Sequence, residues 1–272
     1  MLTRIYLIFL ILTFFLAGCV TTAREAWIDV LSKCASSEAL NNVVYFGPSN
    51  KVGPGSVWRK SDDSLHLRWT LADIEPDEGK LKNLIQEGAL TSCQGETSSE
   101  WKLKPSLAFE SQATPISAEL SADLNRAKSV TVSVDKWAMD LIKEGPFEKW
   151  IKSNKDYSDD LKQQDRLVLE KAVRVIGFST ILDFSESDAI ALKGKYSQPT
   201  LNFGSLGVGM NAEWKSSTKL ELKSNNAFYI AGEFSKINQS SGDVCFGIKS
   251  TGMKFLKNVA VPVNIKISNE IR

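Results

Sequence analysis

The strongest constraint on the fold of this 272-residue chain is the recurrence of apolar residues at every second position. A period of two places one side of a β-strand in a core and the other side in water. Such strand-like stretches cluster near the C-terminus, at 200–214, 220–222, 227–234, 244–248 and 259–267. Short strands at this spacing predict an antiparallel β-sheet or sandwich in the C-terminal third.

Apolar residues at helical spacing indicate helices earlier in the chain, at 24–40, 80–90 and 158–172. Asp135 follows the alternating segment 129–134 and is suited to cap a helix that holds Trp137 and Leu141. A further short helix is expected around Phe147 and Trp150. The predicted fold class is therefore α+β, with helices mainly in the first two-thirds and the sheet or sandwich in the last third.

The N-terminal residues have the pattern of a targeting segment rather than of a folded domain. Arg4 is followed by an unbroken apolar run over 5–16, which is shorter than the roughly 20 residues that span a bilayer. Its end, Leu16-Ala17-Gly18-Cys19, resembles the lipobox of bacterial lipoproteins. The resemblance implies cleavage before Cys19 and attachment of lipid to this residue.

The domain organisation follows from that resemblance. We expect a lipoprotein signal peptide at 1–18, a lipidated tether at 19–23 and a single α+β domain at 24–272, with a polar sub-boundary near 94–105. The membrane would be a partner through the covalent lipid on Cys19, because several buried acyl methylenes stabilise attachment. Val20 rather than Asp after the cysteine favours the periplasmic face of the outer membrane in bacteria of the enteric type.

Three cysteines remain if Cys19 carries lipid, and an oxidising compartment favours their pairing. Cys34 and Cys93 are the candidate disulfide, and they would close a loop of about 60 residues. Cys245 lies in a strand-like segment, where a buried thiol is the simplest interpretation.

Composition limits the classes of function. The chain has 33 Lys and Arg against 32 Asp and Glu, so its formal net charge of +1 argues against nucleic acid as a partner. His66 is the single histidine and lies on the polar side of an alternating segment. We expect no catalytic residue, no metal site and no cofactor, and the protein is more readily interpreted as a binding protein than as an enzyme.

Patterns that resemble catalytic motifs have simpler structural explanations. Ser133 with Lys136 and Ser216 with Lys219 match the Ser-x-x-Lys pattern of penicillin-recognising enzymes, but they lie at strand ends and turns. The glycines at 204–209 lack the Lys-Ser/Thr of a phosphate loop. Acidic pairs at 62–63, 73–78 and 159–160 are suited to turns and helix caps. Trp58 and Trp101 lie in polar stretches and are the candidate contact surface for an envelope protein or a glycan.

The favoured function is a lipid-anchored bacterial envelope protein with a non-enzymatic binding or scaffolding role. One alternative is a membrane-active protein. The segment 204–234, with a Gly-rich alternating strand, a Ser/Lys turn and an apolar strand, resembles the late strands of gasdermin-like pore formers. A second alternative is a cell-wall hydrolase that uses paired carboxylates.

Overall fold

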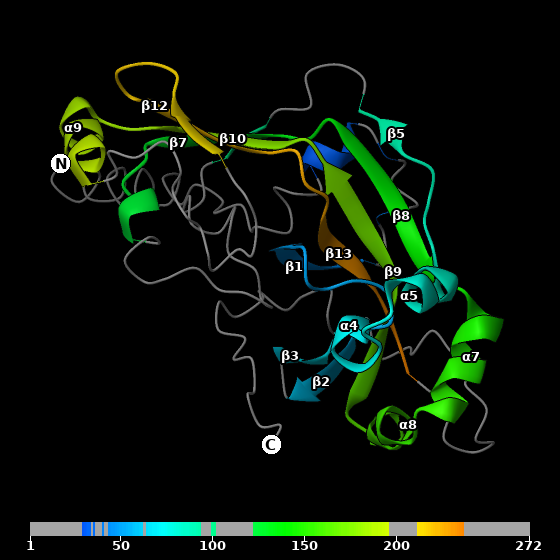
Figure 1. Ribbon diagram of the computed structural model, residues 1–272. Helices are drawn as coiled ribbons and strands as arrows, with labels where there is room; N and C mark the ends of the chain where they lie inside the picture. The colour runs from blue at the N-terminus through cyan, green and yellow to red at the C-terminus, as the bar shows by residue number, and fades with distance from the viewer. Residues whose placement is uncertain are drawn as a thin grey trace, which may run out of the picture.

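The chain forms two connected antiparallel sheets with short helices at their margins (Figure 1). The computed structural model describes residues 29–33, 35, 40, 43–61, 64–93, 99–101, 122–195 and 211–236. Strand residues outnumber helical residues in this part of the chain. The expected helix-rich first two-thirds is therefore wrong, because strands begin at Val44 and the helices lie mainly in the middle.

The elements are short except for the central strand. The helices are α4 (Leu71–Ile74), α5 (Glu78–Leu84), α7 (Glu144–Ser153), α8 (Lys155–Leu161) and α9 (Glu186–Lys195). The strands are β1 (Val44–Ser49), β2 (Val57–Ser61), β3 (Ser64–Trp69), β4 (Ile85–Gln86), β5 (Thr91–Ser92), β6 (Ser99–Trp101), β7 (Ser129–Ser133), β8 (Lys136–Ile142), β9 (Arg166–Ile176), β10 (Phe178–Asp183), β11 (Asn211–Trp214), β12 (Lys219–Ser224) and β13 (Phe228–Ser235).

One long ladder connects the two sheets. β7 pairs with β10 from Ser129 opposite Asp183, and β8 pairs with β9 as far as Leu141 opposite Lys171. Both ladders share one register, so 129–142 and 166–183 form a single two-stranded ribbon. β12 and β13 lie along the other side of the central strand, with a register shift between them. We call the three segments 129–142, 166–183 and 219–235, which pair side by side, the long ribbon.

The long ribbon bends where β9 passes into β10 (Figure 1). Gly177 has a φ of 72°, in the left-handed region that favours glycine. A Cβ atom on Gly177 would collide with the carboxylate of Asp135 on the neighbouring strand. The close approach of the Asp135 side chain and the left-handed conformation therefore both favour glycine at this bend.

The apolar side of the long ribbon changes faces at the bend. Val130, Val132 and Val134 enter the main core from β7 and its end, whereas Trp137 and Met139 pack against the same core from β8. Along residues 129–142, the even-numbered residues face this core before the bend, and the odd-numbered residues face it after the bend. The inside of the bend is therefore filled from both arms by one continuous cluster.

Two smaller cores lie at the lower end of the long ribbon. One contains Trp58, whose ring is tilted against that of Phe46 and edge-to-face with that of Phe234, at centroid distances of 5.7 and 5.6 Å. The other joins α7 and α8 to the sheet through Phe147, Trp150 and Tyr157 and further apolar residues. Burial of these aromatic rings holds the helices against the end of the ribbon.

Two helix predictions are wrong because strand pairing determined these segments. Residues 136–142 form β8, in which Trp137 and Met139 alternate with Ala138 and the buried Asp140. The predicted helix at 158–172 ends at Leu161, and β9 begins at Arg166. The helix around Phe147 and Trp150 is present as α7.

Replacement of the bend glycine should destabilise the fold. We expect Gly177→Ala to lower the free energy of unfolding by about 1–3 kcal/mol, because alanine is strained at this φ and collides with Asp135. Gly194→Ala is the matched control, since a Cβ there meets nothing within 4 Å and lies in α9. The control should be neutral or stabilising by about 0.5–1 kcal/mol. Urea denaturation measures both, and an unchanged Gly177→Ala would contradict the role of the bend.

Candidate functional site: an amphipathic hairpin

The β11–β12 hairpin segregates polar and apolar side chains on its two faces. Ala212 pairs with Leu222 and Trp214 with Leu220 on the apolar face. The opposite face carries polar pairs: Asn211 with Lys223 and Glu213 with Glu221. Among the described strands, β11 lies at the edge of its sheet. The hairpin therefore presents a complete amphipathic pattern at a sheet margin.

Ion pairs organise the polar face near the turn. Lys215 Nζ lies 2.9 Å from Glu213 Oε2 and 3.0 Å from Glu221 Oε2. Hydrogen bonds to these two carboxylates raise the pKa of Lys215. Partial burial raises the pKa of Glu221, but hydrogen bonds from Lys215 and Ser179 outweigh it and leave that pKa below its ordinary value. Lys215 and Glu221 therefore remain charged at neutral pH and keep this face polar.

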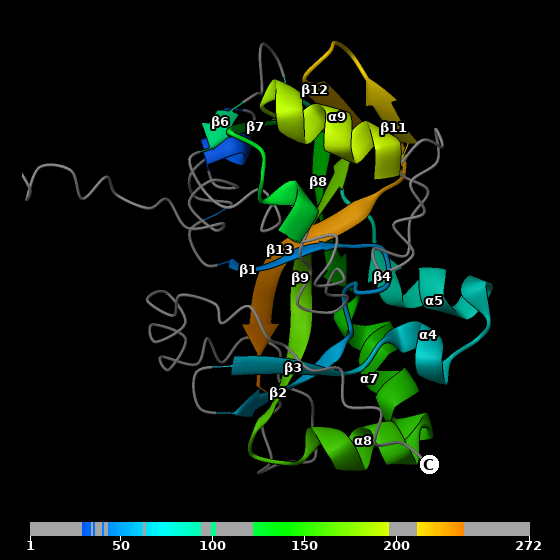
Figure 2. The same ribbon diagram turned by 90° about the vertical axis from the view of Figure 1, so that its left-hand side faces the viewer.

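Helix α9 covers the apolar face. Lys193 Nζ lies 4.6 Å from the ring centroid of Trp214 and donates a hydrogen bond of 2.9 Å to the Ser217 carbonyl. Phe184 packs on the same indole at 6.1 Å. Figure 2 shows α9 lying across the two hairpin strands. The sequence interpretation missed α9. Ser185, whose Oγ accepts from the Asp188 backbone N–H and donates to the Asp188 carboxylate, is the capping residue that could have revealed its start.

The apolar residues of the long ribbon change sides along its length, whereas the paired residues of β11 and β12 keep one apolar face. Its core-facing residues change from even to odd positions at Gly177, as described above. A straightened strand over 129–142 would therefore present apolar residues on both sides. The β11–β12 hairpin therefore has the more regular separation into a polar and an apolar face.

A buried charged network crosses the lower sheet. Asp140 is fully buried and accepts hydrogen bonds from Arg174 Nε at 2.7 Å, Tyr229 Oη at 2.7 Å and Gly88 N at 2.9 Å. These residues come from β8, β9, β13 and the β4–β5 loop. Burial and the Asp140 carboxylate raise the pKa of Tyr229, so its hydroxyl stays protonated as a donor. The network ties four segments together and has the features of a structural site.

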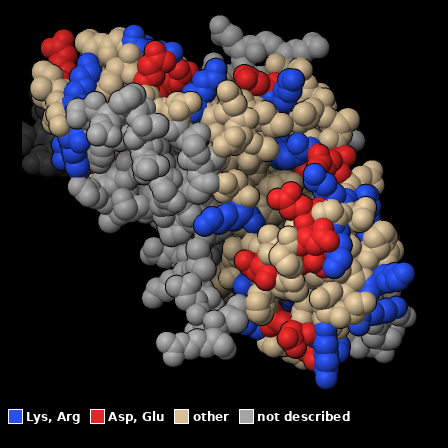
Figure 3. Space-filling view, viewed as in Figure 1, with Lys and Arg blue, Asp and Glu red and all other residues tan. Residues whose placement is uncertain are grey.

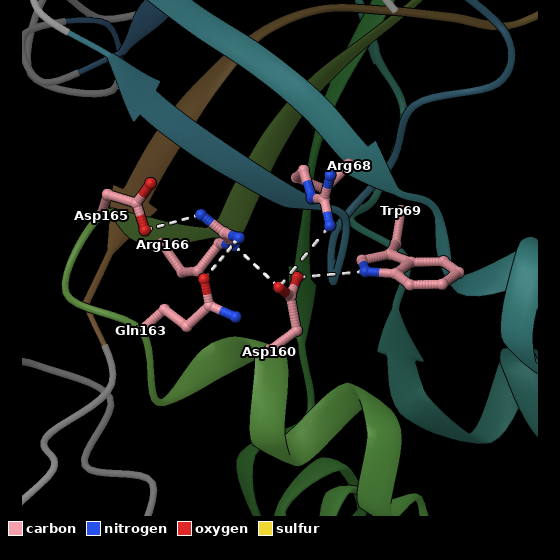
Figure 4. Close-up of polar contacts among 6 residues, drawn as sticks. All are labelled: Arg68, Trp69, Asp160, Gln163, Asp165 and Arg166. Atoms are coloured by element: carbon pink, nitrogen blue, oxygen red, sulfur yellow. Dashed lines mark hydrogen bonds and ion pairs between the residues drawn. The ribbon is translucent and has the colours of Figure 1, made fainter. Parts of the chain in front are cut away.

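A second network joins α8 to the sheet (Figure 4). Asp160 accepts hydrogen bonds from Trp69 Nε1 at 3.0 Å and Arg166 Nε at 2.9 Å, and Arg68 lies 3.9 Å away. Arg166 also donates to Asp165 at 2.6 Å and Gln163 at 2.7 Å. In the sequence, Asp140 is a single charged residue between Met139 and Leu141, whereas Asp160 follows another aspartate. Neither pattern reveals the arginine with which the aspartate pairs.

The two candidate contact tryptophans have different outcomes. Trp58 is 0% exposed and donates a 3.0 Å hydrogen bond from Nε1 to Ser56, so it belongs to the core and not to a contact surface. Its polar sequence neighbours hid the fact that Phe46 and Phe234 pack on it from other strands. Trp101 lies in β6, where its backbone pairs with Val130, and its contact role stays a prediction.

Cys93 is disulfide-bonded in the structure. Its partner lies outside the described residues, as do Cys34, Cys19 and Cys245, so the Cys34–Cys93 pairing stays a prediction. The backbone N–H of Cys93 donates to the Asp135 carbonyl at 2.9 Å. The disulfide is therefore attached directly beside the bend of the long ribbon.

The remaining motif candidates have structural roles where the structure describes them. Ser133 ends β7 and Lys136 begins β8, while Ser216 Oγ accepts from the backbone of Thr218 and Lys219 in a turn. Asp73 and Asp77 cap α4 and α5. His66 is half-buried on β3 opposite Arg59. Residues 204–209 and 62–63 lie outside the described residues.

Across the described ranges, no group of His, Cys, Asp and Glu side chains is arranged to hold a metal ion. None of the helices in this part of the chain is long and apolar enough to cross a membrane. Figure 3 shows basic and acidic side chains interspersed on one face of the molecule, in keeping with the net charge of +1.

Comparisons with known proteins give no family assignment. No protein-family model matches the chain, and no curated protein matches it in sequence. Among solved structures, a bacterial gasdermin from Bradyrhizobium tropiciagri is similar at a TM-score of 0.42 and 13% identity, over 82% of this chain and 90% of that one. A TM-score of this size does not establish a common fold.

Removal of the buried Asp140 carboxylate should lower the free energy of unfolding much more than removal of the exposed Glu87 carboxylate. We expect Asp140→Asn to lower the free energy of unfolding by about 3–5 kcal/mol, because it leaves the Arg174 guanidinium without its buried counter-charge. Glu87→Gln removes an exposed carboxylate 3.6 Å from Arg174 and should cost less than about 0.5 kcal/mol. Urea unfolding of the two variants gives the comparison, and similar losses would refute the structural role of Asp140.

Proposed function

We propose that this protein is a lipid-anchored, membrane-active protein of the pore-forming kind, and that the β11–β12 hairpin is its inserting element. The observation that carries the proposal is the complete separation of apolar and polar pairs on the two faces of this hairpin. Membrane β-strands require this period of two, with one side toward lipid and the other toward water.

The length of the sequence pattern supports the same function. In the sequence, the alternation extends back from Trp214 through Met210 and Val208 to Leu206, and forward from Leu220 through Leu222 to Phe228. Each side of such a hairpin would have nine residues, 206–214 and 220–228, interrupted on the second side by Ser224 and Asn226. A strand that spans the bilayer needs about 9–11 residues.

Insertion would require a defined rearrangement. Helix α9 covers Trp214, so it must move away before the apolar face can contact lipid. Two polar interactions, the cation–π contact and one hydrogen bond, attach Lys193 to the hairpin. These polar contacts contribute modestly to stability. Ala189 and Leu192 of α9 are also buried in the same core as Leu220 and Leu222, so the movement must break this apolar packing as well.

The alternative function, a cell-wall hydrolase that uses paired carboxylates, receives less support from the described residues. The described residues contain three buried aspartates. Asp140 and Asp160 are each neutralised by an arginine, and Asp123 is paired with Lys195. The acidic residues at 73–78 serve in helix caps or ion pairs where their contacts are described. These roles leave the described carboxylates engaged in folding.

The hairpin proposal predicts that charge on one face, but not on the other, prevents membrane permeabilisation. The purified full chain should release dye from liposomes. Ala212→Lys should strongly reduce release, because a lysine on a lipid-facing position costs about 2–4 kcal/mol at the bilayer midplane. Asn211→Lys places the same charge on the adjacent residue of the polar face and should retain release. Circular dichroism confirms that both variants fold.

The outcomes separate the alternatives. Absence of release by the unmodified chain would refute membrane activity. Equal loss in both variants would show that added charge, rather than its face, matters and would refute insertion of this hairpin. Release by the Ala212→Lys variant at the unmodified rate would also contradict the proposed insertion.

The lipid anchor requires its own experiment. We expect the chain expressed in bacteria to incorporate a radioactive fatty acid, and Cys19→Ser to abolish this incorporation, since the thiol of the lipobox is the proposed attachment atom. Cys245→Ser is the control and should leave labelling intact. Unchanged labelling of Cys19→Ser would refute lipidation at this residue.

A further inference from the structure

The charged side chains of the hairpin segment 206–228 share the polar face of β11 and β12. The acidic ones are Glu213 and Glu221, and the basic ones are Lys215, Lys219 and Lys223. The other residues of this segment are uncharged in the sequence. Three basic residues against two acidic ones give the segment a formal net charge of +1.

The charges nearest the turn compensate one another. Lys215 Nζ lies 2.9 Å from Glu213 Oε2 and 3.0 Å from Glu221 Oε2, so it lies between the two carboxylates. Lys219 begins β12 at the same end of the hairpin, where its backbone carbonyl accepts a hydrogen bond from Lys215 N at 2.8 Å. Two basic and two acidic residues therefore leave this end of the polar face neutral.

Lys223 carries the positive charge that remains. It is exposed, and the residues directly opposite it are Asn211 on β11 and Ser179 on β10, which are both uncharged. Glu221 lies two residues away on the same strand, but its carboxylate is already bound by Lys215 and by the Ser179 hydroxyl. The excess charge of the polar face is therefore located at one known position along the strand.

Insertion of the hairpin would turn this face towards water. A hairpin supplies two strands, and strands cross a bilayer only as parts of a closed barrel, so several copies of the chain must join. Each copy would then place one Lys223 at the same depth in the wall of the lumen. Rings of Lys or Arg side chains favour the passage of anions through a pore.

We propose that the pore is selective for anions and that Lys223 is the residue that determines this preference. The proposal rests on insertion of the β11–β12 hairpin, and it adds the chemical class of the species that pass. Residues 206–210 and 224–228 add no charge to the hairpin, so its length beyond Lys223 does not offset this lysine.

The reversal potential in planar bilayers of neutral phosphatidylcholine, under a gradient of potassium chloride, tests the preference with the full chain. The unmodified chain should give a ratio of chloride to potassium permeability above one. Lys223→Gln should bring the ratio towards one, and Lys223→Glu should bring it below one, because each change removes or reverses the ring of charge. The preference should weaken as salt rises, since the screening length falls from about 30 Å at 0.01 M to about 10 Å at 0.1 M.

Lys149→Gln is the matched control. It removes the same charge from an exposed position of α7, outside the hairpin, and should keep the permeability ratio of the unmodified chain. An equal change in Lys149→Gln and Lys223→Gln would overturn the assignment to Lys223.

The outcomes separate this inference from the proposed function. A ratio at or below one in the unmodified chain, or an unchanged ratio in Lys223→Gln, would overturn the anion preference and leave insertion of the hairpin standing. Loss of conductance in Lys223→Gln alone would show that Lys223 serves insertion rather than selectivity, and would overturn the inference as well. Absence of conductance by the unmodified chain would refute the proposed function and this inference together.

Discussion

The fold depends on the central strand 166–183, which is paired on both sides along most of its length. β7 and β8 lie along one side of it, and β12 and β13 lie along the other. The strand can serve both sheets only because Gly177 turns the backbone through a conformation that other residues strain to adopt. The bend places the apolar side chains of both arms around one core, and the positions of the remaining elements follow from it.

Buried charges then connect the margins of the sheet to this strand. Arg174 and Arg166 both project from β9, and each meets a buried aspartate from another element. An ion pair removed from water is not in itself a large source of stability, but loss of one partner is costly because the other remains buried. These pairs therefore specify which segments dock on the central strand, and they explain why the described aspartates of the core serve folding.

The sequence predicted the helices and strands that have a clear local pattern of apolar residues. It missed the features that depend on contacts with segments far away in the chain. The alternation at Val130 and Val132 correctly indicated a strand, and Phe147 with Trp150 indicated a helix. The segment after Asp135 has a residue suited to cap a helix, yet pairing with β9 makes it a strand. Trp58 looked accessible because its neighbours in the chain are polar, whereas its packing partners lie on β1 and β13. The amphipathic hairpin was visible as alternation, but its cover by α9 required the fold.

Insertion of the β11–β12 hairpin, as we propose it, requires that the apolar side of β11 meets lipid and that the polar side does not. A fluorophore attached at position 212, on the apolar face, and at position 211, on the polar face, reports this when the vesicles contain nitroxide-labelled lipids. If the hairpin inserts, lipid nitroxides should quench the fluorophore at position 212 and leave the fluorophore at position 211 bright. Equal quenching at both positions, or none at either in vesicles that release dye, would contradict insertion of the hairpin.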